Sequence, residues 1–381
     1  MQKTLKQRNG ESNMKQLIVL SAGGTGGHCF PALACALALR EAGYKIYWIG
    51  NGTFAQKLTK DYQIDFCDVK MKGLTDRSII TYFVVVILLF MRIIRCLGIL
   101  LKIRASSIVT FGGYTTAPVG IAAWLLRIPL FIHEQNSVAG KVNRLLAPFA
   151  TAIAISYQPT FHLTKKSILK KLYLTGNPIV NETIEYARKN SKLPSEQLRV
   201  LILGGSQGAH AINKIFLEAV PKIKTSTLIT CVHQCGEAHE LSIRSMYNSI
   251  GVTSDNSQFK VYGFLRPIAH WYQWCDLVIA RAGAMTLAEL ALFGIPSILI
   301  PLPTSADNHQ WHNGCYYSSR GAALIKAEHE CSSDWLSDQL LQFATEKRVL
   351  LNKMSESCKT LSIPEATSHL LQLIISSHGK K

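Results

Sequence analysis

Two glycine-rich turns carry the residues best suited to chemistry in this chain. The first is Gly23-Gly24-Thr25-Gly26-Gly27-His28, and the second is Gly204-Gly205-Ser206-Gln207-Gly208-Ala209. Each follows a run of β-forming residues and precedes a stretch of helical periodicity. Glycine lets backbone amides approach a ligand, and the helix N-terminus behind them favours negative charge. One turn in each half predicts two nucleotide-type halves that face each other across a cleft.

The first turn differs from the common nucleotide-binding loops. In the dinucleotide pattern G-x-G-x-x-G, counted from Gly24, the third glycine position holds Cys29. The second strand ends near Gly50 without an acid to hold a ribose, and no Gly-Lys-Ser/Thr follows for a P-loop. The sequence therefore argues against a nicotinamide oxidoreductase and a P-loop enzyme. The turn does supply His28 at the start of a helix, where a phosphate or sugar could bind.

A third turn, at residues 281–286, repeats this arrangement after an expected strand at 276–280. The backbone N–H groups of 284–286, backed by a helix dipole, suit a diphosphate. Thr286 and Glu289 have the spacing of a capping box, which is the favoured interpretation from spacing alone. In the alternative interpretation, the Glu289 carboxylate accepts hydrogen bonds from two neighbouring ribose hydroxyls.

Two polar clusters follow buried strands. One is His133-Glu134-Gln135-Asn136, at the carboxyl end of a strand, where α/β proteins bind ligands. The other is residues 307–313, in which amides and a carboxylate stand beside Trp311, a combination that suits a sugar. We expect both clusters to lie at the cleft.

Charge and composition narrow the function classes. The chain has 41 Lys and Arg against 24 Asp and Glu, a net charge of +17, which suggests nucleic acid, a phosphate-bearing substrate or an anionic membrane as partner. No compact metal-ligand motif occurs, so helix N-termini and cationic side chains would stabilise a diphosphate leaving group. No G-x-S-x-G elbow indicates a hydrolase. The ten cysteines form no CxxC pair, which predicts scattered thiols in a reducing compartment.

The apolar segment at residues 79–91 bears on membrane association. Its thirteen residues are apolar or aromatic except Thr81, and a spanning helix needs about 20. One interpretation is a buried helix of an α/β layer. The other is an interfacial helix whose basic rim contacts anionic headgroups, and the excess positive charge favours it. Both hold if one face packs and the other contacts the bilayer. The rim comprises Lys70, Lys72, Arg77, Arg92 and Arg95.

Alternating strands and helices must position these motifs. Strands are expected at 17–21, 45–49, 107–110, 129–133, 152–156 and 171–175, and again at 199–203, 227–232, 259–262, 276–280 and 296–300. Helices are expected from about Pro31, Ala209 and Thr286. This alternation predicts an α/β fold of two Rossmann-like, doubly wound parallel-sheet domains. The expected divisions are a disordered prefix at 1–13, an N-terminal domain at 14–180, a linker at 181–197, a C-terminal domain at 198–360, and a helix and tail at 361–381 that pack back toward the N-terminal domain.

Taken together, the motifs resemble the MurG family of UDP-N-acetylglucosamine–N-acetylmuramyl-(pentapeptide) pyrophosphoryl-undecaprenol N-acetylglucosaminyltransferases. The resemblance runs from about Lys15 to the C-terminal helices. It rests on seven motifs in family order: Gly23–His28 with Phe30-Pro31-Ala32, Gly112-Gly113-Tyr114, His133–Asn136, Thr175-Gly176-Asn177-Pro178, Gly204–Ala209, His233-Gln234 with Gly236, and Arg281–Glu289.

The resemblance implies a GT-B glycosyltransferase with two Rossmann-like domains facing a cleft. Its N-terminal domain would bind the acceptor lipid, and its C-terminal domain would bind most of UDP-GlcNAc. The implied reaction transfers GlcNAc with inversion to the MurNAc 4-hydroxyl of lipid I, giving lipid II in peptidoglycan synthesis, without metal or other cofactor. The implied location is peripheral, on the anionic cytoplasmic face of the bacterial inner membrane. Other cell-wall and division enzymes are candidate partners, and nucleic acid is not.

Site residues follow from the resemblance by motif. His28 is the candidate catalytic base and Glu134 the second candidate. The implied UDP-GlcNAc ligands are Thr25, Gly26 and Gly27, Asn136 at the sugar, Ser206 and Gln207 at the diphosphate, Phe264 and Leu265 at the uracil, Ala284, Met285 and Thr286 at a phosphate, Glu289 at the ribose, and His309 and Gln310 at the sugar. Lys72, Arg77, Arg92 and Arg95 are implied to contact the acceptor or the membrane.

The chain departs from the family pattern at several positions. Val180 stands where an arginine that contacts phosphate is usual, Pro267 replaces an aspartate, and His309 replaces a glutamine. Residues 50–60 also lack an expected acid. Two alternatives follow: another UDP-sugar GT-B transferase that acts on a glycolipid such as diacylglycerol, and a UDP-sugar-binding cell-wall scaffold without turnover.

Overall fold

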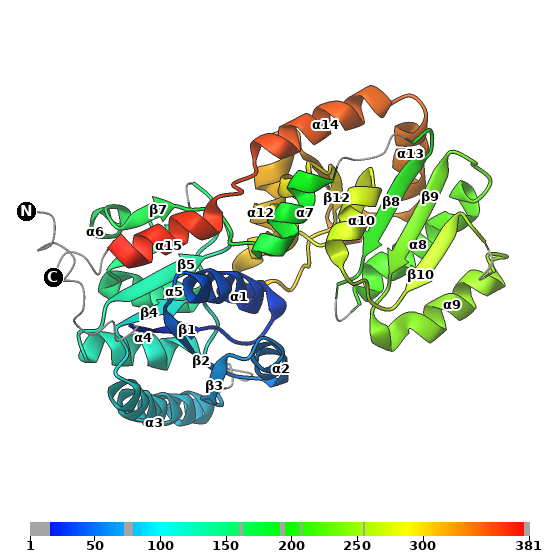
Figure 1. Cartoon of the computed structure of the whole chain (residues 1–381). Coiled ribbons are helices and arrows are strands. Elements are labelled where there is room, and N and C mark those ends of the chain that lie inside the picture. The colour runs from blue at the N-terminus through cyan, green and yellow to red at the C-terminus, as the bar shows by residue number, and fades with distance from the viewer. Residues whose placement is uncertain are drawn as a thin grey trace, which may run out of the picture.

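The computed structural model describes residues 16–71, 79–158, 160, 163–190, 195–205, 208–253 and 256–376, with the side chains of 79–83 left out. The expected prefix at 1–13 lies outside these residues. The described chain forms two halves, each built on a parallel sheet with helices on both faces (Figure 1). The predicted α/β class with two doubly wound sheets is confirmed.

The N-terminal sheet has seven strands in the order β3-β2-β1-β4-β5-β6-β7. Their bounds are β1 Leu17–Ser21, β2 Lys45–Gly50, β3 Asp65–Asp68, β4 Ser107–Thr110, β5 Leu130–Glu134, β6 Ala152–Ile155 and β7 Leu172–Leu174. The helices of this half are α1 Gly26–Glu41, α2 Thr53–Asp61, α3 Ile79–Ile103, α4 Thr116–Leu125, α5 Lys141–Leu146 and α6 Lys166–Leu169.

The C-terminal sheet has six strands in the order β10-β9-β8-β11-β12-β13. Their bounds are β8 Leu198–Leu203, β9 Ile229–Gln234, β10 Phe259–Tyr262, β11 Leu277–Ala280, β12 Ser297–Leu299 and β13 Ala323–Ile325. The remaining helices are α7 Asn181–Lys189, α8 His210–Ile223, α9 Glu240–Ser249, α10 Ile268–Trp274, α11 Ala284–Phe293, α12 His309–Ser318, α13 Ser333–Ala344, α14 Arg348–Thr360 and α15 Ala366–Ser376.

Alternate residues of the central strands pack on opposite faces of each sheet. In β1, Ile18 and Leu20 belong to one buried cluster and Val19 to the other. In β8, Val200 and Leu201 divide in the same way. Side chains of a strand alternate between faces, so a strand that is apolar at every position needs cover on both sides. This explains the continuous apolar runs at 17–20 in β1 and 200–203 in β8.

The C-terminal helix completes the core of the N-terminal half. Leu370 and Ile374 of α15 are fully buried in the same cluster as Ile18 and Leu20. Figure 1 shows α15 lying beside α1, after α14 has run along the other half. The chain therefore crosses between the halves a second time, between α14 and α15.

Several element boundaries differ from the sequence expectations. Helix α1 begins at Gly26, not near Pro31, which lies inside the helix. Because proline is common in the first turn of a helix, Pro31 suggested a start that lies five residues after the observed one. Helix α2 and strand β3 were not expected. Residues 181–197, expected as a linker, begin with α7, whose Ile184 packs against Met285 of the C-terminal half.

Helix α3 is longer than the thirteen-residue apolar segment suggested. Among the described residues it is the one helix long and apolar enough to cross a membrane, over Val84–Ile103, and 11% of that window is buried. The earlier length estimate is wrong, because Arg92 and Arg95 interrupt the apolar run without ending the helix. Cys96 and Leu100 are buried against the sheet, so one face of α3 belongs to the core.

Candidate active site

The strand order places the glycine turns at the switch point of each sheet. In the N-terminal sheet the order reverses between β1 and β4, and in the C-terminal sheet it reverses between β8 and β11. Loops at such a point leave in opposite directions and open a crevice at the carboxyl ends of the strands. The turns after β1, β8 and β11 are the three glycine turns that the sequence singled out. Helices α1 and α11, which start from two of these turns, contact each other across the halves.

His28 lies in the first turn of α1, two residues after Gly26 and next to Gly27, with Thr25 as the N-cap. Its ring packs on Gly112, where a Cβ would lie 3.2 Å from the His28 Cε1. Gly112 also has a φ of +88°, so a side chain there would be strained as well as crowded. No contact with His28 was predicted for Gly112 and Gly113, which belong to one of the motifs of the family resemblance. Their position after the neighbouring strand was the available signal.

The electrostatics of His28 favour a neutral imidazole. Burial lowers the pKa of His28, while the Gln135 side chain and the Phe111 carbonyl act in the opposite direction. Its Nδ1 and the Gln135 Oε1 are both buried without a hydrogen-bond partner. A neutral imidazole has one nitrogen with a lone pair, and it can therefore accept a proton at neutral pH.

Glu134 is 1% exposed, and donors surround its carboxylate. Oε1 accepts hydrogen bonds from the Asn136 backbone N–H at 3.0 Å and its side-chain amide at 3.3 Å. Oε2 accepts from the Gly140 N–H at 2.9 Å and the Asn143 amide at 2.8 Å. Burial raises the pKa of Glu134, and these four hydrogen bonds oppose the shift. The carboxylate thereby holds the loop between β5 and α5.

The β5–α5 loop also contacts the C-terminal half. Asn136 Oδ1 accepts a hydrogen bond from the Asn313 side-chain amide at 3.0 Å. Arg144 of α5 forms an ion pair with Asp307 at 2.7 Å. Asn313 belongs to the polar cluster at 307–313 that was expected at the cleft, but no individual role was predicted for it, although it lies four positions after His309 on α12. Residues with that spacing share a helix face, which was the available signal.

Helix α11 presents its first turn to the same crevice. Gly283 is the N-cap, and Ala284, Met285 and Thr286 are the first three helical residues. The N–H groups of a first turn have no partner within the helix and can bind an anion. The favoured capping-box interpretation is wrong, because Thr286 lies inside the helix and no side chain caps it.

Glu289 lies one turn further along α11, where Tyr272 donates a hydrogen bond to its Oε2 at 2.9 Å. Burial raises the pKa of Glu289 to about 7, against the effect of this hydrogen bond. Leu265 packs in one cluster with Tyr272, and the Arg266 guanidinium lies 4.8 Å from the centre of the Phe264 ring. The uracil and ribose candidates therefore converge around α10. Sequence reasoning did not identify Tyr272.

His309 and Gln310 begin α12. His309 Nδ1 lies 2.8 Å from the Ala306 carbonyl, so Nδ1 carries the hydrogen, because a carbonyl only accepts. Burial lowers the pKa of His309, and the charges of Glu134 and His28 also act on it. These three groups are thus close enough to interact across the cleft. Gln310 Oε1 accepts from the Leu302 N–H at 3.0 Å.

Four predicted site residues lie outside the described residues: Lys72, Arg77, Ser206 and Gln207. Arg92 and Arg95 lie on α3, away from the crevice residues, and Arg92 adjoins Lys70 around a small surface hollow. Among the described residues, no group of three or more His, Cys, Asp or Glu side chains is placed to hold a metal ion.

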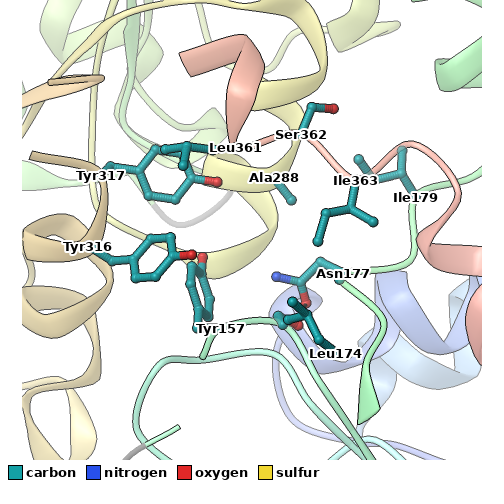
Figure 2. Close-up of a pocket in the computed structure, with 12 residues that line it drawn as sticks. Tyr157, Leu174, Asn177, Ile179, Ala288, Tyr316, Tyr317, Leu361, Ser362 and Ile363 are labelled. Carbon is teal, nitrogen blue, oxygen red and sulfur yellow. Dashed lines mark hydrogen bonds between the residues drawn. The ribbon is translucent and has the colours of Figure 1, made fainter. Parts of the chain in front are cut away.

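A separate small hollow, partly open to solvent, lies where the chain crosses between the halves (Figure 2). Asn177 and Ile363, one from each crossing, line it together with an aromatic group. Figure 2 shows Tyr157 and Tyr316 pointing toward one another, with ring centres 4.8 Å apart. None of the predicted site residues lines this hollow.

Comparison with known proteins identifies both halves. Residues 18–155 match the glycosyltransferase family 28 N-terminal domain, and residues 199–370 match its C-terminal domain. The chain is 33% identical over 364 residues to the UDP-N-acetylglucosamine–N-acetylmuramyl-(pentapeptide) pyrophosphoryl-undecaprenol N-acetylglucosamine transferase of Pseudomonas entomophila, covering 95% of this chain and 98% of that one. The protein of the same name from Tolumonas auensis is 34% identical over 366 residues, covering 94% and 98%. The crystal structure of Acinetobacter baumannii MurG superposes with a TM-score of 0.75 at 28% identity, covering 95% of this chain and 99% of that one.

The raised pKa of Glu289 predicts a pH-dependent stability. The folded protein holds this proton up to a pH of about 7, whereas the unfolded chain releases it near 4.5. Stability from this group is therefore full below 4.5 and is lost as pH rises through 7. Between pH 5 and pH 8 this group should lower the free energy of unfolding of wild type by on the order of 1–3 kcal/mol. The Glu289→Gln variant should lack this decrease when both proteins are unfolded in urea. An identical pH dependence in both proteins would contradict the assignment.

Proposed function

The chain belongs to glycosyltransferase family 28, and on that premise we propose that it transfers GlcNAc from UDP-GlcNAc to undecaprenyl-pyrophosphoryl-MurNAc-pentapeptide. Support for this substrate pair comes from relatives of that named activity, which match nearly the whole chain. The product is lipid II, and the enzyme is an inverting, UDP-GlcNAc-dependent transferase of peptidoglycan synthesis.

The observation that carries the proposal is that His28 and residues 284–286 lie in the first turns of α1 and α11, two helices that contact each other across the halves. The 4-hydroxyl of MurNAc attacks C1 of the GlcNAc, a C–O bond forms, and the bond from C1 to the diphosphate oxygen breaks. His28 accepts the hydroxyl proton, since burial keeps its imidazole neutral before the step. UDP leaves with the electron pair, and the N–H groups of 284–286 bind its negative charge.

We assign Glu134 a supporting role in this reaction. A general base needs an oxygen lone pair directed at the substrate, but the two Glu134 oxygens already accept four hydrogen bonds. The carboxylate is also 1% exposed. Glu134 therefore orders the loop that carries Asn136, a proposed GlcNAc ligand. His309, Gln310 and Glu289 complete the proposed donor site.

We further propose that α3 docks the enzyme on an anionic membrane, at the cytoplasmic face where a lipid-linked acceptor would be presented. Its outer face exposes apolar side chains, among them Ile87 at 58% and Phe90 at 63%. At about 3.6 residues per turn, Arg92, Arg95 and Lys102 fall along one edge of this face. Because Cys96 and Leu100 anchor the opposite face in the core, α3 lies along the surface of the protein. This geometry suits a peripheral interfacial helix.

The proposed reaction predicts UDP release that requires both substrates. Purified protein is incubated with UDP-GlcNAc and a short-chain lipid I analogue in the presence of EDTA, and UDP is measured by a coupled assay. We expect UDP to form only when both substrates are present. Release without the acceptor would indicate hydrolysis, and release with diacylglycerol in place of the lipid I analogue would indicate another glycolipid transferase.

The role of His28 predicts a separation of binding from turnover. His28→Ala should leave the UDP-GlcNAc dissociation constant within about twofold of wild type and lower kcat roughly 10²-fold or more. It should also abolish the acid limb of the pH–rate profile, which wild type should show below pH 6.5 because the pKa of His28 is lowered. His329→Ala is the matched control, since the His329 side chain is 81% exposed and its ion-pair partner is Glu330, which has no part in the proposed reaction. An unchanged kcat would remove His28 from the role of base.

The docking helix predicts charge-dependent vesicle binding. Replacing Arg92, Arg95 and Lys102 with serine should weaken co-sedimentation with vesicles containing phosphatidylglycerol, because each basic residue near the surface contributes about 1 kcal/mol. The control replaces Lys214, Lys260 and Lys353, exposed residues of the C-terminal half, and has the same net charge. Equal binding by the two triple variants would assign α3 to intramolecular packing alone.

A further inference from the structure

The Asn313 side chain forms four hydrogen bonds where the two halves meet. It is fully buried on α12. Its Oδ1 accepts from the Ser137 backbone N–H and from the Ser137 hydroxyl, each at 2.9 Å. Its Nδ2 donates to Asn136 Oδ1 at 3.0 Å and to the Ala282 carbonyl at 3.3 Å. An amide side chain has two acceptor sites and two donor hydrogens, so every one is used.

These bonds join three segments that carry the proposed reaction. Ser137 follows Asn136 in the loop that Glu134 holds on the N-terminal half. Asn313 itself lies on α12, one turn after His309. Ala282 precedes Gly283, the N-cap of α11, whose first turn faces the diphosphate in the proposed function. A single side chain therefore links the loop on the acceptor side with the two elements that bind the donor.

A second contact restrains the same interface. The ion pair of Arg144 with Asp307 lies at the start of α12, and each side chain is about 30% exposed. Asp307 and Asn308 have φ values of +50° and +53°, which non-glycine residues seldom adopt. Such conformations persist where surrounding contacts fix them. The exposed ion pair is worth little in energy, so the buried bonds of Asn313 dominate the contact.

We propose that Asn313 and Ser137 form a positioning contact that sets the distance between His28 on one half and the bound donor sugar on the other. This inference rests on the proposed function. Neither residue needs to touch the reacting atoms. Their effect arises because a misplacement of about 1 Å between reacting groups can cost up to 10²-fold in rate.

The central variant is Ser137→Ala, which removes the hydroxyl donor and leaves the backbone N–H in place. We expect kcat for the lipid I analogue to fall roughly three- to tenfold. The dissociation constant of UDP-GlcNAc should stay within about twofold, since the donor is held mainly by the C-terminal half. Ser337→Ala is the matched control: that serine is also fully buried, but its hydroxyl donates within α13 to the Asp334 carbonyl. It should lose comparable thermal stability and keep its kcat.

A double variant tests whether Ser137 acts through Asn313. If it does, Ser137→Ala combined with Asn313→Ala should be no slower than Asn313→Ala alone, because the shared contact is already lost. Multiplicative losses would overturn the proposal, as would a kcat of Ser137→Ala equal to that of Ser337→Ala.

Deuterium uptake separates this inference from the proposed function. The Ser137→Ala variant should exchange faster in peptides covering 134–144 and 305–313, and Ser337→Ala should not. If the wild-type chain releases no UDP, the proposed function fails, and this exchange measurement alone decides whether the contact holds the halves. Unchanged exchange in 305–313 would overturn the contact whatever the activity.

Discussion

The buried carboxylate of Glu134 is the interaction on which the arrangement of the cleft depends. A buried charge is costly unless hydrogen bonds compensate it, and here all four donors come from the ten residues that begin at Glu134. Satisfying the carboxylate therefore fixes the path of the chain from β5 into α5. That path places Asn136 and Ser137 within reach of α12. The contact between the halves is thus a consequence of solvating one carboxylate from within the protein.

Much of the fold could be predicted from the sequence, because buried parallel strands have a strong local signature. The strand at 107–110 was predicted at its observed bounds, and the strands ending at Ser21 and Leu203 were correct within a residue. Each is an apolar run closed by glycine or polar residues, so composition alone delimits it. The predicted helix boundaries were wrong where a local sequence feature is compatible with more than one structure. Pro31 was taken as a helix start, and the arginines of α3 obscured the length of its apolar face.

The candidate site was only partly accessible to sequence reasoning, and the reason is geometric. Glu134 ends a strand, and His28 and Glu289 lie on the helices that follow two other predicted strands, where ligands bind in α/β folds, so their position was informative. What each does depends on partners distant in sequence: Gln135 for His28, Tyr272 for Glu289, and Ser137 for Asn313. No local pattern specifies such pairs. The two roles considered for Glu289 could be separated only once α11 was seen to begin before Thr286.

The two crossings of the chain determine how the halves can move. One crossing runs through Asn177 and Ile179 before α7, and the other runs through Ser362 and Ile363 before α15. A body tethered at one point can swivel in any direction, whereas two tethers leave rotation about the line that joins them as the easy motion. The hollow of Figure 2 lies on that line, between the crossings. Opening of the cleft would therefore be a hinge rotation about this line, and it would break the hydrogen bonds that Asn313 forms with Asn136 and Ser137.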